Sequence, residues 1–259
     1  MRVSRVLSRL KEGKPSWGLT MHCTDPSFFE MAALLDVQAI WMDMEHHGYS
    51  VETASNQMRA TRVANTDVVA RPAKGEFMRM ARMLEMGATG IMYPRCDSPE
   101  EAAEVVKWSK FAPIGKRGCD TGNPDAPYCI TPMTEYLKAA NEQTFVIIQL
   151  EEQHDVDQAD EIAAVEGVDF LMLGPGDYGV LSGFPGDMNH PKIDDAINKI
   201  ASAAAKHNKH WVATCPTLDH AKRYLDLGAG LLFHGGDLTI LKAGIEQIQA
   251  SMLGLGIPR

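Results

Sequence analysis

Short apolar runs alternate along this chain with longer segments whose apolar residues recur at helical spacing. The runs are bounded by polar or glycine positions, as expected for buried parallel strands, and the longer segments show the period of amphipathic helices. Such alternation is typical of βαβ units and a parallel sheet. The predicted strands are residues 16–21, 39–44, 67–71, 89–94, 144–151, 168–173, 210–214 and 230–234. The predicted helices are residues 26–35, 51–63, 76–86, 99–108, 156–164, 191–206, 218–227 and 238–252.

Eight consecutive strand–helix units favour a closed barrel over an open, doubly wound sheet. Gly87, Gly167 and Gly228 follow predicted helices, where glycine suits the left-handed position before the chain turns into a strand. The fold class is therefore predicted to be α/β, a (β/α)8 TIM barrel. The length of 259 residues fits one such domain over residues 1–259.

Three further segments complete the expected organisation. Two insertions, residues 111–132 and 174–190, are expected near functional ends of the barrel, and residues 1–17 are expected to contain a short helix. The N-terminal segment lacks the unbroken apolar core of a secretory signal. The longest apolar runs are strand-length, far short of the roughly 20 residues that cross a bilayer, so no membrane partner is expected.

Composition narrows the class of protein further. The five cysteines are scattered without a CxxC pair, which argues against a disulfide framework and a structural zinc site, and favours a cytoplasmic protein. The net charge of −9, with no dense Lys/Arg cluster, argues against a nucleic-acid partner. The expected partners are therefore small molecules.

The carboxyl ends of barrel strands carry the active site, and polar residues collect at four of the predicted strand ends. Glu151 and Asp177 follow adjacent strands, so their carboxylates can meet at one side of the barrel mouth. Two carboxylates, with water and a chelating substrate, suit a hard divalent cation, Mg²⁺ or Mn²⁺. The alternative is that each is a solvated loop carboxylate.

Arg71 ends the third predicted strand and precedes Pro72, which favours an extended backbone and aims the side chain out of the strand end. Its planar guanidinium is matched to an enolate or a carboxylate. The alternative role is a structural ion pair with Glu45 or another carboxylate.

His46 is the acid–base group at these ends with an ordinary pKa near neutrality. His47 is adjacent, and the doublet does not identify which histidine acts. Asp43 is expected to orient His46 only where regular strand geometry has ended, since positions three apart face oppositely on a strand. Asp237, after the last strand, is expected to cap the following helix.

Six motifs together resemble the HpcH/HpaI aldolase family, class II pyruvate-dependent aldolases, and the resemblance runs in unbroken order over nearly the whole chain. The motifs are Asp43-Met-Glu-His46, Val69-Ala-Arg-Pro72, Leu84-Glu-Met-Gly-Ala88, Gln149-Leu-Glu151, Val165-Glu-Gly-Val-Asp169 and Gly174-Pro-Gly-Asp177.

The resemblance implies a barrel of the phosphoenolpyruvate/pyruvate-domain type with a divalent metal held by Glu151 and Asp177. The metal would be Mg²⁺ or Mn²⁺, with Co²⁺ or Zn²⁺ as alternatives. Arg71 would bind the 2-oxo group beside Gln149, and the N–H groups of Gly176 and Asp177 would hold the substrate carboxylate.

The same resemblance implies that His46 acts as the base with support from Asp43, and that Glu85 reaches the histidine of a neighbouring subunit in a homo-hexamer, a trimer of dimers with exchanged C-terminal helices. Three positions depart from the family pattern. Glu85 replaces an Asp, Thr20 stands where Trp is common, and residues 118–128 replace an Arg-containing loop. The acceptor aldehyde therefore stays open.

The predicted function is a metal-dependent aldolase that cleaves a 4-hydroxy-2-oxo acid to pyruvate, or a close 2-oxo acid such as hydroxypyruvate, and an aldehyde. A Schiff-base aldolase needs a pocket lysine, and no predicted strand ends in lysine. Two alternatives are an acyl-CoA lyase of the malyl or citramalyl type and a noncatalytic 2-oxo-acid binding protein.

Overall fold

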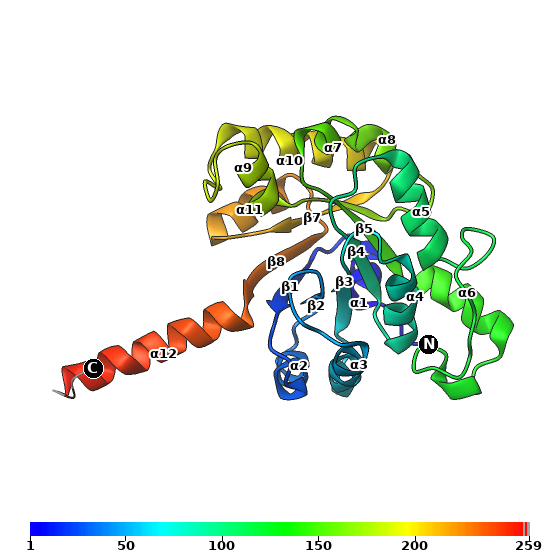
Figure 1. The fold of residues 1–259 in the computed structure, drawn as a ribbon, viewed down its shortest axis with the longest axis horizontal. Coiled ribbons are helices and arrows are strands. Elements are labelled where there is room, and N and C mark those ends of the chain that lie inside the picture. The colour runs from blue at the N-terminus through cyan, green and yellow to red at the C-terminus, as the bar shows by residue number, and fades with distance from the viewer. Residues whose placement is uncertain (256, 258–259) are drawn as a thin grey trace.

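The computed structural model describes residues 1–255 and 257, and its eight strands form a closed, all-parallel barrel (Figure 1). Each strand pairs with its neighbour in sequence, and the last pairs with the first. The predicted (β/α)8 fold is confirmed. The domain prediction for residues 1–259 also covers residues 256, 258 and 259, which lie outside the described residues. The strands are β1 (Ser16–Met21), β2 (Ala39–Asp43), β3 (Asp67–Arg71), β4 (Gly90–Tyr93), β5 (Phe145–Leu150), β6 (Phe170–Leu173), β7 (His210–Thr214) and β8 (Leu231–Gly236).

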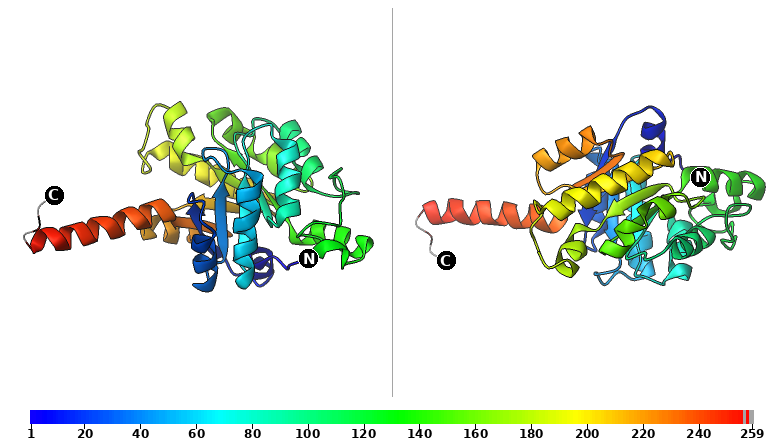
Figure 2. Two further views of the ribbon diagram at one scale, coloured as in Figure 1. Left: turned by 60° about the horizontal axis from the view of Figure 1, so that its bottom comes forward. Right: turned by 90° about the horizontal axis from the view of Figure 1, so that it is seen from above.

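Helices cover the outside of the barrel, as the views in Figures 1 and 2 show. The predicted C-terminal glycines are confirmed, since Gly87, Gly167 and Gly228 have φ of 114°, 88° and 84°. The helices and short helical turns are α1 (Arg5–Lys11), α2 (Pro26–Leu34), α3 (Val51–Ala60), η1 (Thr61–Val63), α4 (Phe77–Met86), α5 (Pro99–Ser109), η2 (Pro127–Cys129), α6 (Met133–Gln143), α7 (Gln153–Asp157), α8 (Ala159–Ala163), α9 (Pro175–Leu181), α10 (Pro191–Lys206), α11 (Leu218–Asp226) and α12 (Asp237–Gly254).

Three helical segments differ from the expectation. α6 precedes β5 in a stretch for which no helix was predicted, and α9 lies inside the expected insertion 174–190. The expected helix over 156–164 is two short helices, α7 and α8, because the backbone of Gln158 between them leaves helical geometry at φ −97°, ψ 10°.

The insertion 111–132 lies at the opposite end of its own barrel from the strand ends that carry function, which corrects the expectation for this segment. It follows α5, and a helix of a β/α unit ends where the next strand begins. The N–H of Asp125 donates to the carbonyl of Glu85 at the end of α4, at 3.2 Å, and Arg62 donates to the carbonyl of Pro124, at 3.0 Å. Residues 174–190 follow β6 and lie at the functional end.

The apolar core has two layers, one inside the barrel and one between the strands and the helices. Inside, the rings of Phe145 and Phe170 pack with centroids 5.3 Å apart, and Gly90 leaves the space that the Phe145 ring fills. Val6 of α1 belongs to this inner cluster, so α1 closes the amino-terminal end of the barrel. The predicted N-terminal helix is thereby confirmed, and the polar strand ends remain at the other end.

α12 leaves the barrel and projects away from it (Figure 1), and within this helix Asp237 alone is buried. Its exposed apolar side chains include Ile240, Ile245, Ile248 and Met252, each at least 45% accessible. Among the residues described, no helix is both long and apolar enough to cross a membrane.

Candidate active site

Arg71 lies at the centre of the polar residues that the strand ends bring together. Register pairs it with Asp43 across β2 and β3, and its Nε and Nη2 donate to the two Asp43 carboxylate oxygens at 3.1 and 2.8 Å. Its Nη1 donates to Gln149 Oε1 at 3.4 Å, and Glu45 Oε2 lies 3.3 Å from Nε. With the guanidinium also 4.6 Å over the ring of Trp41, its plane is fixed.

These contacts set the charge state of Asp43. Burial acts to raise the pKa of this carboxyl, but hydrogen bonds from Arg71 and from the N–H groups of Glu45 and His46 outweigh it, and the pKa lies below its ordinary value. Asp43 is therefore ionised at neutral pH. The structural ion pairs considered as the alternative role of Arg71 are thus present, and they also leave the guanidinium held in one orientation at the barrel mouth.

Glu151 directly follows β5, and the residue is 2% exposed. Burial first, and the negative charge of Asp177 second, raise its pKa from 4.5 to about 8, against the opposing effect of Arg71. Among the residues described, its Oε2 has no hydrogen-bond partner. Any side chain at Gly174 would collide with this carboxylate. The fold thus places an acidic group where the nearby cations Arg71 and Arg95 offset its charge only in part.

Asp177 and Gly176 lie in the first turn of α9, within the stretch 174–190 for which no helix was predicted. The helix begins after Gly174, with Pro175 at its first position. N–H groups in a first helical turn have no acceptor within the helix. Asp177 is half-buried and Gly176 exposed, and the charge of Asp177 acts on Glu151.

The histidine doublet is arranged differently from the expectation that Asp43 faces His46. β2 ends at Asp43, and the Asp43 carboxylate accepts the His46 backbone N–H at 3.4 Å. The His46 ring is exposed, with Nε2 3.6 Å from Glu45 Oε2. The ring beside the Asp43 carboxylate belongs to His47, whose Nε2 lies 3.7 Å from Oδ2. Asp43 therefore touches both histidines, one through its backbone and the other through its ring.

A second cluster, formed by His22, Asp43 and His47, was not predicted. The His22 and His47 rings lie 4.3 Å apart, and all three residues offer ligand atoms within 4.8 Å of one another. The signal that could have found it is the polar ending of strands β1 and β8. His22 follows β1, and Asp237 follows β8.

Asp237 does not cap α12, which corrects the expectation, because Gly236 occupies the N-cap position. Its carboxylate instead accepts the backbone N–H groups of His22 and Cys23, at 2.8 and 2.6 Å, and contacts His22 Nδ1 at 3.0 Å. Burial opposes ionisation of Asp237, but these hydrogen bonds outweigh it and lower its pKa. Asp237 thus fixes the chain after β1 and the orientation of His22.

Glu85 lies near the end of α4, at the amino-terminal end of its own barrel. The structure therefore does not bring it near His46 of the same chain. Its backbone carbonyl holds the insertion 111–132 through Asp125. The remaining predicted site residues, by contrast, come from strand ends or from segments that directly follow them.

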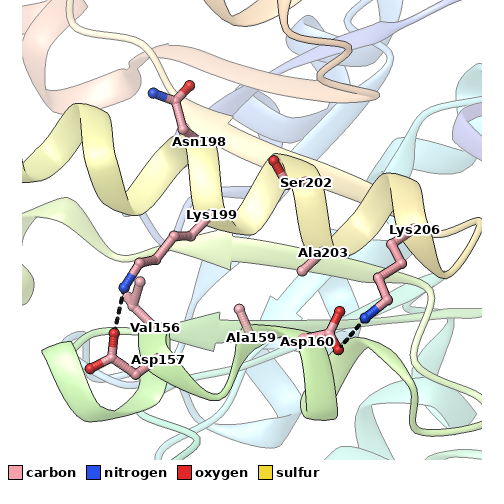
Figure 3. Close-up of a pocket in the computed structure, with 9 residues that line it drawn as sticks. All are labelled: Val156, Asp157, Ala159, Asp160, Asn198, Lys199, Ser202, Ala203 and Lys206. Atoms are coloured by element: carbon pink, nitrogen blue, oxygen red, sulfur yellow. Dashed lines mark hydrogen bonds and ion pairs between the residues drawn. The ribbon is translucent and has the colours of Figure 1, made fainter.

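Two hollows differ sharply in their relation to this site. A cavity of about 740 Å³ at the barrel mouth is lined by Glu45, Arg95 and neighbouring residues. A groove of about 430 Å³ lies between α7–α8 and α10 on the outside of the barrel (Figure 3). Its lysines, Lys199 and Lys206, are paired with acidic residues of α7 and α8. Of the two, the mouth cavity is the one that adjoins Arg71 and its partners, through Glu45.

Comparison with known proteins decides the family. Residues 17–241 match the family model described as HpcH/HpaI aldolase/citrate lyase. The chain belongs to this family. The predicted resemblance and enzyme class are confirmed: this HpcH/HpaI family member is an aldolase, a carbon–carbon lyase.

Curated relatives and a solved structure agree with this assignment. The chain is 30% identical to a hydroxypyruvate/pyruvate aldolase of Pseudomonas aeruginosa, over 97% of this chain and 94% of that protein. It is 30% identical to a 5-keto-4-deoxy-D-glucarate aldolase of Salmonella arizonae, over 86% of each. The crystal structure of an HpcH/HpaI aldolase/citrate lyase family protein from Burkholderia cenocepacia superposes with a TM-score of 0.88 at 28% identity, covering 96% of this chain and 99% of that one.

Proposed function

We propose that this aldolase reversibly cleaves a 4-hydroxy-2-oxo acid to an aldehyde and pyruvate, or a close 2-oxo acid such as hydroxypyruvate, with a divalent cation held by Glu151 and Asp177. The observation that carries the proposal is the buried, unpaired carboxylate of Glu151 beside Asp177. The names of the curated relatives, which act on such 2-oxo acids, support the donor substrate.

The donor set at Glu151 fits a hard cation. The buried Glu151 carboxylate has an acidic neighbour, and its raised pKa means that Arg71 and Arg95 do not fully offset its charge. Oxygen ligands of this kind suit Mg²⁺ or Mn²⁺. The His22–Asp43–His47 cluster offers nitrogen ligands that suit Zn²⁺ or Co²⁺, but Arg71 already compensates Asp43 and Asp237 already holds His22. The incompletely compensated negative charge at Glu151 and Asp177 therefore favours this pair as the site of the cation. When bound there, the cation supplies Lewis-acid stabilisation of negative charge on the 2-oxo acid.

Arg71 is the protein's own group for the developing charge on the 2-oxo oxygen. Asp43, Glu45 and Gln149 hold its guanidinium in place before substrate arrives, so little reorganisation is needed as charge develops. The free first-turn N–H groups of Gly176 and Asp177 would receive the substrate carboxylate. The two ends of the 2-oxo acid are thus fixed by different elements.

His46 is the proposed proton acceptor, with Asp43 holding its backbone and leaving its ring accessible at the mouth. In cleavage, His46 takes the proton of the 4-hydroxyl group as the C3–C4 bond breaks. The electrons of that bond pass to C3, giving the aldehyde and the enolate of the 2-oxo acid. Protonation of C3 then yields pyruvate.

The proposal includes a cytoplasmic homo-hexamer, a trimer of dimers that exchanges α12. The uncovered apolar side chains of α12 support exchange between subunits. Glu85 and the insertion 111–132 lie away from the mouth of their own barrel, which fits a role for Glu85 at the His46 of a neighbouring subunit.

The metal requirement and the absence of a Schiff base are tested together. EDTA is expected to abolish pyruvate-forming cleavage of a 4-hydroxy-2-oxo acid, and added Mg²⁺ or Mn²⁺ to restore it. Borohydride with pyruvate is expected to leave the mass of the protein unchanged. A stable covalent pyruvate adduct, with cleavage that survives EDTA, would contradict the proposal.

A further inference from the structure

Two histidine rings lie beside the candidate active site and have no part in the proposed reaction. His22 follows β1, His47 follows β2, and the ring centroids are 4.3 Å apart. The two side chains are 21% and 33% exposed, so solvent reaches both. Together with Asp43 they offer ligand atoms within 4.8 Å of one another. Two imidazoles and one carboxylate are a ligand set that divalent transition metals take in proteins, with water in the open positions.

The tautomer of His22 is set by Asp237. Nδ1 of His22 lies 3.0 Å from Oδ1 of Asp237, a carboxylate that its hydrogen bonds keep ionised at neutral pH. Because an ionised carboxylate can only accept, Nδ1 carries the proton, and Nε2 of the neutral ring keeps its lone pair. Within residues 1–255 and 257, this Nε2 has no hydrogen-bond partner. A carboxylate placed behind a histidine in this way is the usual support of a metal-binding imidazole.

His47 and Asp43 supply the other two ligands. In the part of the chain that the structure describes, neither ring nitrogen of His47 has a hydrogen bond, and Nε2 lies 3.7 Å from Oδ2 of Asp43. Oδ1 of Asp43 accepts Nε of Arg71 and two backbone N–H groups. Oδ2 accepts Nη2 of Arg71 and, among the same described residues, no second donor. Since a carboxylate oxygen has two lone pairs, Oδ2 can bind a metal as well.

Ligand type separates the His22–Asp43–His47 cluster from the pair Glu151 and Asp177. The pair offers carboxylate oxygens, which suit Mg²⁺ or Mn²⁺, whereas imidazole nitrogens suit Zn²⁺ and its neighbours in the first transition row. Charge alone does not call for a cation at the cluster, because Arg71 already pairs with Asp43. The two nitrogen donors therefore select the ion by its type, and we expect Mg²⁺ to leave the cluster unbound.

We propose that His22, Asp43 and His47 form a second metal site, which takes Zn²⁺ or a similar transition metal and inhibits the enzyme when it is filled. Inhibition follows from the shared carboxylate. Nη2 of Arg71 donates to Oδ2 of Asp43 at 2.8 Å, and a divalent ion on the same oxygen would repel the guanidinium and weaken that contact. Arg71 would then lose the fixed orientation that stabilises developing charge. The site is independent of the proposed function, whereas its inhibitory effect rests on it.

Binding is measured by calorimetric titration of Zn²⁺ into protein saturated with Mg²⁺ at pH 7.5. Wild type is expected to bind Zn²⁺ at the cluster, and Glu151→Gln, which alters the other site, should still bind one Zn²⁺ per chain. His22→Ala and His47→Ala each remove one of three ligands. Each should weaken this binding by about 100-fold or more, because losing a residue that merely supports a ligand already costs about 10- to 100-fold.

A matched control and a spectroscopic probe make the result specific. His154→Ala removes a histidine that lines the mouth cavity and lies outside the cluster, so it should bind Zn²⁺ as wild type does. Co²⁺ in place of Zn²⁺ reports nitrogen ligation by its visible absorption, which should appear in Glu151→Gln and be lost in His22→Ala. His22 and His47 are partly exposed, so both alanine variants should melt close to wild type.

Inhibition is measured by exchange of the pyruvate methyl protons with D₂O at saturating Mg²⁺. Zn²⁺ at the concentration that fills the cluster should slow exchange by wild type by about 10-fold or more, as expected when a preorganised charge-stabilising group is displaced. His22→Ala should exchange with Mg²⁺ and resist the same Zn²⁺ concentration. Resistance in this variant shows that Zn²⁺ does not act by replacing Mg²⁺ at Glu151 and Asp177.

The outcomes separate the site, its effect and the proposed function. Wild type that binds no Zn²⁺, or Zn²⁺ binding that survives His22→Ala and His47→Ala but is lost in Glu151→Gln, would overturn the site. Zn²⁺ that binds at the cluster without slowing exchange, or that inhibits His22→Ala as strongly as wild type, would overturn the inhibitory role. Wild type that binds Zn²⁺ at the cluster but exchanges no pyruvate protons with Mg²⁺ contradicts the proposed function and leaves the site standing.

Discussion

Glu151 is a buried carboxylate whose negative charge is not fully compensated by the protein. The carboxylate follows β5, lies against Gly174 and faces the charge of Asp177, while the cation at Arg71 is bound by Asp43 and Glu45. Burial and Asp177 raise its pKa to about 8, so a proton or a cation must balance it in the folded state at neutral pH. A metal bound there, as proposed, would therefore compete with a proton for the Glu151 carboxylate.

Glu151→Gln is expected to stabilise the metal-free protein at neutral pH. The folded pKa of about 8 exceeds the ordinary 4.5, so the stability that wild type has below pH 4.5 is lost as pH rises toward 8. Each unit of difference corresponds to roughly 1.4 kcal/mol. Melting temperatures in EDTA should thus separate at pH 7.5, with the variant higher, and converge near pH 4.5. A variant that melts lower at pH 7.5 would contradict this pKa.

The sequence predicted which polar residues lie at the strand ends better than it predicted the contacts between them. Asp43 and Arg71 were assigned separate roles, but the register of β2 and β3 places them side by side. Asp43 was expected to orient His46, but of the two histidine rings it is that of His47 that lies beside the Asp43 carboxylate. Residue type at a strand end can be read directly, whereas ring orientation depends on how the loop folds back. The roles proposed for His46 and Glu85 stay predictions.

At the scale of elements, buried strands were predicted closely because their apolar runs are short and bounded. β1, β3 and β7 match the predicted ranges 16–21, 67–71 and 210–214. Short helices at the functional end were harder. α9 begins with Pro175-Gly176, which also suits a tight turn, and nothing local distinguishes the two. Its first turn nevertheless carries Asp177, so a helix that the sequence did not predict positions one of the predicted site residues.

α12 illustrates the same limit at a helix end. Asp237 is a residue type that often caps a helix, but here Gly236 occupies the cap and the Asp237 carboxylate binds the chain after β1. Strand β1 and α12 are over two hundred residues apart in sequence. A contact between residues so far apart cannot be predicted from the sequence around Asp237. Here it outweighs the tendency of aspartate to cap the helix that follows it.

At the scale of the whole molecule, an isolated barrel leaves much apolar surface on α12 uncovered. A helix whose Ile240, Ile245 and Ile248 are all more than half exposed gains stability by packing against another chain. The residues proposed to bind substrate, by contrast, come from the strand ends of one chain. The proposed hexamer is therefore expected to complete the site through Glu85 and not to create it.

The double substitution Ile245→Asp and Ile248→Asp is expected to reduce the size of the assembly. The two positions are three apart and share one face of α12, so two buried charges would meet in the subunit contact. Sedimentation velocity measures the change. Gln247→Asp, on another side of the same helix, is the control and should leave the wild-type mass. An assembly of unchanged mass in the double variant would contradict exchange of α12.

The central claim is that Glu151 and Asp177 hold the cation that allows this chain to enolise a 2-oxo acid. The most direct measurement is exchange of the pyruvate methyl protons with D₂O, followed by NMR with Mg²⁺ present. Wild type should exchange with Mg²⁺ and stop in EDTA, and Glu151→Gln should slow exchange by about 100-fold or more at the same Mg²⁺ concentration. Exchange by Glu151→Gln at the wild-type rate, or exchange by wild type that persists in EDTA, would contradict the claim.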